Sequence, residues 1–171
     1  MKIINKQNTS SNCFICGDKN DCGLHMDFYE TDTNELLSLF TTKNHHQSYP
    51  NRTHGGVISA ILDETMGRAI LIYEKETWGV TAELNVKFKK PVPLDTELKV
   101  IARITKNTRL IFTGTGEIFD DEGNIYATAT GKYFKVPLEN ITGIDMKNEW
   151  IDKDLTSEEI RCIKEKLNQN I

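Results

Sequence analysis

The sequence lacks the features that would place it outside ordinary globular domains. None of its 171 residues lies in an apolar stretch long enough to span a bilayer, and the opening MKIINKQNTSSN has no apolar run of a secretory signal. A formal net charge of −4 provides no positive field to gather nucleic acid. We therefore expect a cytoplasmic protein with neither nucleic acid nor a membrane as partner.

Cysteine is scarce, with only four in the chain. Cys13, Cys16 and Cys22 cluster while Cys162 lies far away, which is not the pattern of a disulfide framework. Together with His25, the first three offer three thiolates and one imidazole, a possible structural zinc set. Because His25 falls at the start of a predicted strand, we expect no metal and keep zinc as the alternative.

The periodicity of apolar residues predicts six strands and one long helix before the C-terminal region. The predicted strands are 24–30, 35–42, 79–90, 97–105, 110–119 and 125–136, and the helix is 55–73. The strand 79–90 alternates strictly, which places Val80, Ala82 and Leu84 on one face and Thr81 on the other. The helix is apolar on most sides, so it belongs inside the protein.

Runs of strands around a single buried helix indicate an α+β fold with an antiparallel sheet wrapped around that helix. We expect one domain over residues 13–137, preceded by a flexible lead-in at 1–12. Residues 138–171 form an extension. Within it, Thr156 and Glu159 make a capping box that opens a short helix ending near residue 168.

The densest candidate for chemistry is His54-Gly55-Gly56 at the start of the long helix. Two glycines let a ligand approach the backbone closely. The first N–H groups of a helix lack internal partners and can stabilise a carbonyl oxygen that becomes an oxyanion. From spacing alone, a simple tight turn into the helix explains the glycines equally well.

Two acidic residues follow on the same helix and differ in their partners. Glu64 has Arg68 four residues later, the favourable order for a helical ion pair. Asp63 has no basic residue at that spacing, and an unpaired carboxylate on an apolar helix is costly to bury. Asp63 is therefore the predicted reactive group.

The spacing of these groups constrains the assembly. Gly56 and Asp63 are seven residues apart, so they stand ~10 Å apart along the helix axis. One reacting carbonyl carbon cannot contact both within one chain. If both act on it, they come from two chains, and a symmetric dimer with two shared sites follows.

Three motifs give the sequence a family resemblance. They are Cys13-Phe14-Ile15-Cys16-Gly17, then His54-Gly55-Gly56-Val57-Ile58 with Leu62-Asp63-Glu64, and Thr81-Ala82-Glu83-Leu84-Asn85-Val86 with Pro91-Val92-Pro93. Together they resemble hotdog-fold thioesterases of the phenylacetyl-CoA thioesterase type, over residues 13–136.

The resemblance implies a hotdog fold, an acyl-CoA substrate, no cofactor, and a homodimer or dimer of dimers joined edge to edge. It implies that Asp63 is nucleophile or general base and that the N–H of Gly55 or Gly56 polarises the thioester carbonyl. It also implies that Thr81 places the attacking water or the substrate, and that His54 is a positioning residue at the helix entrance.

The loop before the helix departs from part of that pattern. Some branches have an asparagine that binds the thioester where this chain has Ser48. Carbonyl binding then falls to the backbone, to His46 or to Asn51, although polar loop residues are often simply solvated.

Basic residues near the end of the strand 79–90 are candidates for contacting the phosphates of coenzyme A. They are Lys87, Lys89 and Lys90, together with Arg109. The alternative is a solvated edge that discourages aggregation of sheets.

Two other functions compete with hydrolysis. A hotdog domain that binds or senses acyl-CoA without turnover is the main alternative, but the sequence shows no DNA-binding segment of the kind such sensors carry. A hotdog hydratase would need a close Asp and His pair, which is not found. The presence of Asp63 favours catalysis.

Overall fold

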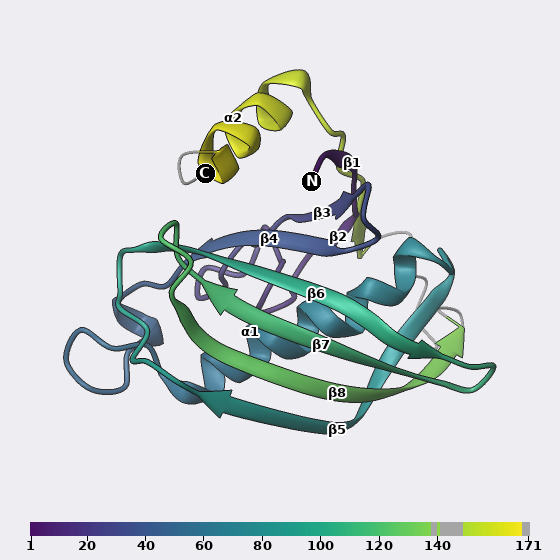
Figure 1. Cartoon of the computed structure of the whole chain (residues 1–171), viewed down its shortest axis with the longest axis horizontal. Helices are drawn as coiled ribbons and strands as arrows, with labels where there is room; N and C mark the ends of the chain where they lie inside the picture. The colour runs from purple at the N-terminus through teal and green to yellow at the C-terminus, as the bar shows by residue number, and fades with distance from the viewer. Residues whose placement is uncertain (138–139, 141–148, 169–171) are drawn as a thin grey trace.

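A computed structural model describes residues 1–137, 140 and 149–168. Its strands are β1 (Ile3–Lys6), β2 (Thr9–Ser10), β3 (Phe28–Thr31), β4 (Leu36–Thr41), β5 (Thr77–Phe88), β6 (Glu97–Asn107), β7 (Ile111–Phe119), β8 (Ile125–Pro137) and β9 (Trp150–Ile151). Seven of them form one antiparallel sheet in the order β1-β3-β4-β6-β7-β8-β5 (Figure 1). The other two, β2 and β9, pair with each other.

The long helix α1 (Gly55–Arg68) runs across the inner face of this sheet and tightens into a short 3-10 helix, η2 (Ala69–Ile72). Ile61, Leu62 and Met66 of α1 are fully buried and belong to the main core. Burying apolar side chains of a helix against an apolar sheet face is the main stabilising contribution in such a layer. This arrangement is the hotdog fold, as predicted.

The opposite face of the sheet carries a second, smaller core beneath the C-terminal helix α2 (Ser157–Asn168) (Figure 1). Ile163 of α2 is buried against Tyr29, Leu37 and Ile101. These sheet residues alternate with Phe28, Leu36 and Val100 of the main core, so one end of the sheet is covered on both faces. No helix of the described residues is long and apolar enough to cross a membrane.

The N-terminal segment differs from the prediction. Residues 1–12, expected as a flexible lead-in, contain β1, which pairs with β3, and β2, which pairs with β9. Residues 24–27 are not in a strand, and β3 begins only at Phe28. The predicted connection at 137–150 falls largely outside the described residues, although its last residue begins β9.

Strand β5 also departs from strict alternation. It pairs with β8 in register from Thr77 to Thr81, and the register then shifts by one residue between Thr81 and Glu83. Ala82 is therefore a β-bulge, and the bulge reverses which residues face the helix. The prediction that Thr81 lies opposite to Leu84 was wrong, because both are now on the helix face. Val80, predicted to share a face with Leu84, lies on the other face and is 41% exposed.

Candidate active site

Asp63 lies in the second half of α1, where β5 and β8 pass beside the helix. The hydroxyl of Thr81 is within hydrogen-bond distance of both carboxylate oxygens, at 3.0 Å from Oδ1 and 3.1 Å from Oδ2. The bulge at Ala82 makes this contact possible, since it turns Thr81 from the outer face toward the helix. The structure thus brings together two residues that the sequence predicted as catalytic.

A third residue at this carboxylate was not predicted. Tyr133 on β8 donates its hydroxyl to Asp63 Oδ1 at 3.1 Å. The side chain is fully buried and stacks on Phe112, with ring centroids 4.9 Å apart. A Cβ on Gly131 would come within 2.6 Å of the Tyr133 hydroxyl, so glycine leaves the room that the phenol needs. A buried tyrosine must find a partner for its hydroxyl, and this requirement was the available signal.

The surroundings of Asp63 shift its proton affinity. Burial raises the pKa of Asp63 above its usual value, while the hydrogen bonds from Thr81 and Tyr133 oppose that rise. The neighbouring Glu64 has a partner of its own, because Arg68 donates a hydrogen bond to it at 2.7 Å, as predicted. Within the part of the chain that the structure describes, the result is a half-buried carboxylate held in place by hydroxyls and not by a cation, which suits a base or nucleophile.

At the start of α1 the two glycines are not equivalent. The Gly56 N–H donates to Nδ1 of His54, the residue that caps the helix, at 2.9 Å. Among the hydrogen bonds of the described residues, the Gly55 N–H has no acceptor. The structure therefore favours Gly55 as the amide that polarises a carbonyl and gives His54 the role of ordering the turn.

A hollow of about 420 Å³ opens beside Gly55. Its walls include three predicted residues, Ser48, Lys89 and Lys90, and a further basic residue, Arg52. Apolar side chains complete it, among them Phe88 of β5, which is 55% exposed. A mostly apolar hollow with basic residues at a helix N-terminus fits a ligand that carries both an apolar chain and phosphates.

Asp63 lines a separate hollow of about 250 Å³, together with Thr81 and Trp78. Neither hollow contains both Gly55 and Asp63. The two residues are eight positions apart on one helix, which corresponds to ~12 Å along its axis. The described chain therefore presents the two halves of the predicted site at a distance that one thioester carbon cannot bridge.

The other two predicted loop residues lie outside these linings. His46 is buried, accepts from the Lys43 N–H at 3.0 Å and contacts the Cys22 carbonyl oxygen at 3.0 Å through its other ring nitrogen. Burial lowers the pKa of His46, which favours the neutral ring that these bonds require. Asn51 is exposed with φ of 62°, and its N–H donates to Gln47. Both shape the loop in this structure.

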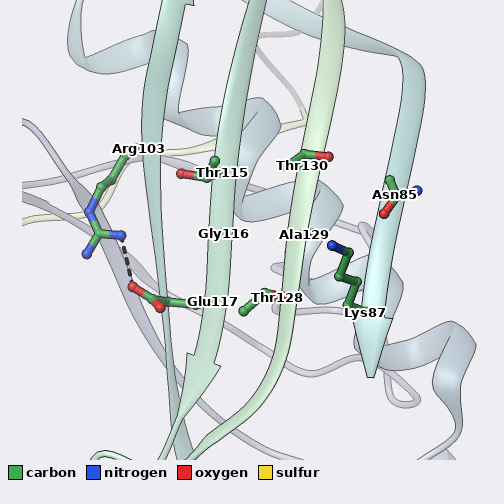
Figure 2. A pocket seen from close by; sticks show the side chains of 9 residues that line it. All are labelled: Asn85, Lys87, Arg103, Thr115, Gly116, Glu117, Thr128, Ala129 and Thr130. Atoms are coloured by element: carbon green, nitrogen blue, oxygen red, sulfur yellow. Dashed lines mark hydrogen bonds and ion pairs between the residues drawn. The ribbon is translucent and has the colours of Figure 1, made fainter. Parts of the chain in front are cut away.

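The remaining basic candidates are dispersed. Lys87 points to the outer face of the sheet, into a hollow of about 320 Å³ that crosses β5, β6, β7 and β8 (Figure 2). That surface is rich in threonine and carries the Arg103–Glu117 ion pair at 2.9 Å. Arg109 lies between β6 and β7. Neither joins Lys89 and Lys90 at the hollow beside Gly55.

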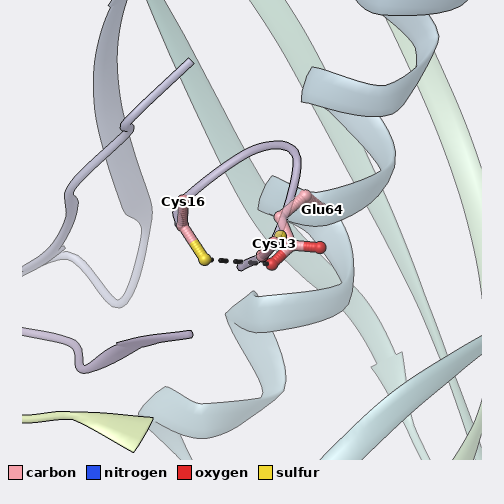
Figure 3. Close-up of side chains that lie close together, drawn as sticks. All are labelled: Cys13, Cys16 and Glu64. Carbon is pink, nitrogen blue, oxygen red and sulfur yellow. Dashed lines mark hydrogen bonds between the residues drawn. The ribbon is translucent and has the colours of Figure 1, made fainter. Parts of the chain in front are cut away.

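The four residues of the alternative zinc set do not come together. Cys13, Cys16 and Glu64 place their ligand atoms within 4.8 Å of one another (Figure 3). Within the described residues, Cys22 and His25 do not join this group. The guanidinium of Arg68 donates to Cys16 Sγ at 3.2 Å and to Glu64, so a cation already occupies two of the three candidate ligands. These residues do not fit a zinc ion.

The hotdog fold with a carboxylate on its central helix defines the class of protein, and comparisons with known proteins agree with that class. Residues 51–127 match the family model of the thioesterase superfamily. This segment runs from the loop before α1 to the start of β8 and includes Gly55, Asp63 and Thr81. The chain has the hotdog fold, and over this segment it is similar to the thioesterase superfamily, with acyl-CoA thioesterases among the proteins it resembles.

One curated protein and two solved structures illustrate this similarity in sequence and in fold. Acyl-coenzyme A thioesterase THEM4 of Mus musculus is 33% identical over 113 residues, which are 66% of this chain and 48% of the mouse protein. A thioesterase structure from Haemophilus influenzae aligns with a TM-score of 0.64 at 16% identity, covering 74% of this chain and 89% of that one. A Bacillus halodurans protein solved with CoA aligns with a TM-score of 0.53 at 26% identity, covering 58% and 66%. The chain spans about half the length of the curated relatives it matches.

Proposed function

We propose that this protein hydrolyses an acyl-CoA thioester to a carboxylic acid and free coenzyme A. The observation that carries the proposal is Asp63, a half-buried carboxylate that is held by Thr81 and Tyr133 and has no cationic partner among the described residues. The homology to acyl-CoA thioesterases and the CoA in the Bacillus halodurans structure support this substrate class.

In this mechanism Asp63 accepts a proton from water as the water oxygen attacks the thioester carbon. The carbonyl oxygen becomes an oxyanion and is stabilised by the Gly55 N–H and the positive end of the helix dipole. The intermediate then expels the thiolate of coenzyme A, which takes up the proton from Asp63. Direct attack by Asp63 to form an anhydride uses the same residues. Neither route requires a metal.

The two halves of the site come together in a homodimer, in which Asp63 of one chain faces Gly55 of the other. Strand β5 is an edge of the sheet, and most of its residues are exposed. An unpaired edge strand is a template for pairing with another chain. Pairing of two β5 edges joins the two sheets and buries Phe88, and a dimer of such dimers is a further possible assembly. The basic residues Arg52, Lys89 and Lys90 then meet the phosphates of coenzyme A.

The test is release of free thiol from a panel of acyl-CoAs of different chain length and aryl character. Asp63→Asn keeps the shape of the side chain and removes the base, so kcat/KM falls by a factor of about 10² or more. Glu83→Gln, an exposed carboxylate on the outer face of β5, is the matched control and retains activity. Folded wild-type protein that binds acyl-CoA but turns over none of the panel would refute hydrolysis and leave a binding module.

A further inference from the structure

The Cys13–Cys16 pair is a chemical group that the proposed hydrolysis does not use. The two residues lie in one tight turn, closed by a hydrogen bond from the Gly17 N–H to the Cys13 carbonyl at 2.8 Å. A Cβ on Gly17 would lie 2.5 Å from the backbone of Cys13, so only glycine allows this closure. Side chains three residues apart in such a turn share one side, and the two sulfurs lie within 4.8 Å of each other. Both thiols are free.

Several hydrogen-bond donors surround the two sulfurs, and the carboxylate of Glu64 lies within 4.8 Å of both. Cys13 Sγ accepts from the Ile15 N–H at 3.3 Å. Cys16 Sγ accepts from the Ser10 N–H at 3.5 Å and from the buried guanidinium of Arg68 at 3.2 Å. Donors and a nearby cation favour a thiolate, whereas the Glu64 carboxylate opposes it. For Cys16, the hydrogen bond with Cys13 and burial outweigh the nearby Arg68 and raise the pKa, so Cys16 keeps its proton.

The geometry also gives the two sulfurs different roles. Cys13 is partly exposed, whereas Cys16 is fully buried. Hydrogen bonding with Cys16 lowers the pKa of Cys13 to about 6, although burial opposes the shift. Cys13 is therefore the accessible nucleophile, and Cys16 lies behind it as a second thiol that small reagents do not reach directly.

We propose that Cys13 and Cys16 form a thiol–disulfide modification site that reacts with low-molecular-weight disulfides such as oxidised glutathione. The Cys13 thiolate attacks one sulfur of the reagent, and one glutathione thiolate leaves. Cys16 loses its proton to that thiolate and attacks the Cys13 sulfur, which expels the second glutathione. Two protein thiols are oxidised to one disulfide, while one reagent disulfide is reduced to two thiols.

The turn is compatible with the product. A disulfide requires Cα atoms about 4.4–6.8 Å apart, and residues three positions apart in one helical-type turn are close neighbours, with Cβ atoms about 5–6 Å apart. The sulfurs therefore reach bonding distance by rotating their side chains. Arg68 keeps its bonds to Glu64 and to the Asn8 carbonyl at 2.9 Å when Cys16 turns away.

The test treats the reduced full-length chain with oxidised glutathione, alkylates the remaining thiols after acid quenching and maps each cysteine by mass spectrometry. The proposal predicts an internal Cys13–Cys16 disulfide, detected as the loss of two hydrogens from their peptide. The exposed Cys22 and Cys162 instead carry glutathione or the alkylating reagent. In Cys16→Ser, which is nearly isosteric, Cys13 keeps its glutathione because nothing displaces it.

Two outcomes would overturn the proposal. One is alkylation of both Cys13 and Cys16 as free thiols under conditions in which Cys22 already carries glutathione. The other is one equivalent of zinc in the purified wild-type protein that is lost in Cys13→Ser and retained in Cys22→Ser. Neither readout depends on thioester hydrolysis, so the result stands apart from the proposed activity.

Discussion

At the scale of residues, the character of Asp63 results from opposing influences. Burial disfavours its charged form, whereas Thr81 and Tyr133 donate hydrogen bonds that favour it. A carboxylate with a raised pKa is a stronger base than an exposed one. The balance depends on hydroxyls that can be removed one at a time.

Replacing Tyr133 with phenylalanine tests that balance. Because the carboxylate loses a hydrogen bond that lowers its pKa, Tyr133→Phe moves the acid limb of the kcat/KM profile to higher pH. Stacking on Phe112 is kept, so the protein remains folded. Tyr126→Phe is the control, since Tyr126 is on the same strand as Tyr133 but donates its hydroxyl to Asp120 in the turn between β7 and β8. An acid limb at the same pH in both variants contradicts the role of Tyr133.

The sequence identified Asp63 because Glu64 has a cationic partner in Arg68 and Asp63 has none. It did not identify Tyr133, because the contact depends on how β8 passes the helix and on the space left by Gly131. It also could not distinguish Gly55 from the following glycine. That distinction comes from the rotamer of the capping histidine, which accepts a hydrogen bond from only one of the two glycine N–H groups.

At the scale of elements, the helix and the long strands were predictable from periodicity, but two features were not. The bulge in β5 leaves the alternation of apolar residues intact through Leu84, so nothing in the strand itself marks Ala82. It is set by pairing with β8. Strand β1 is short and half-exposed, and it forms through its pairing with β3, some 25 residues later. Long-range pairing of this kind leaves little local signal.

Docking of α2 onto the sheet gives a prediction at this scale. Glu159 pairs with the buried Lys6 at 2.6 Å and accepts from the Thr156 N–H at 2.9 Å, as the capping box predicted. Burial alone would raise the pKa of Glu159, but the bonds with Lys6 and Thr156 outweigh it and lower the pKa to about 2. The stabilisation is therefore present above about pH 4.5 and is lost as pH falls toward 2.

We expect Glu159→Gln to lower the free energy of unfolding by about 1 kcal/mol at pH 7, since glutamine keeps the capping box but not the charge. Urea unfolding at several pH values measures the difference, which should shrink below pH 4.5. Glu158→Gln, on the same helical turn and exposed, is the control. A difference that does not vary with pH would show that the Lys6 pair adds no stability.

At the scale of the whole molecule, the separation of Gly55 and Asp63 is the dominant feature. The hotdog fold places both on one helix, one at its start and the other in its second half, with separate hollows beside each. The sequence predicted this separation, because helical rise converts spacing into distance. The shapes of the hollows were not predictable, since they depend on loop residues such as Arg52 and on the end of β5.

The most direct test of the account is complementation between two inactive chains. Gly55→Pro removes the unpaired N–H at the first helical position, where proline is well tolerated, and the preceding His54 has a compatible ψ of 135°. Gly55→Ala keeps the N–H and is the matched control. Heterodimers of Gly55→Pro and Asp63→Asn chains, purified through a different affinity tag on each chain, contain one intact site. The account predicts about half the wild-type thioesterase activity for these heterodimers, although each variant alone is inactive. Heterodimers that are as inactive as either parent would contradict a site shared between two chains.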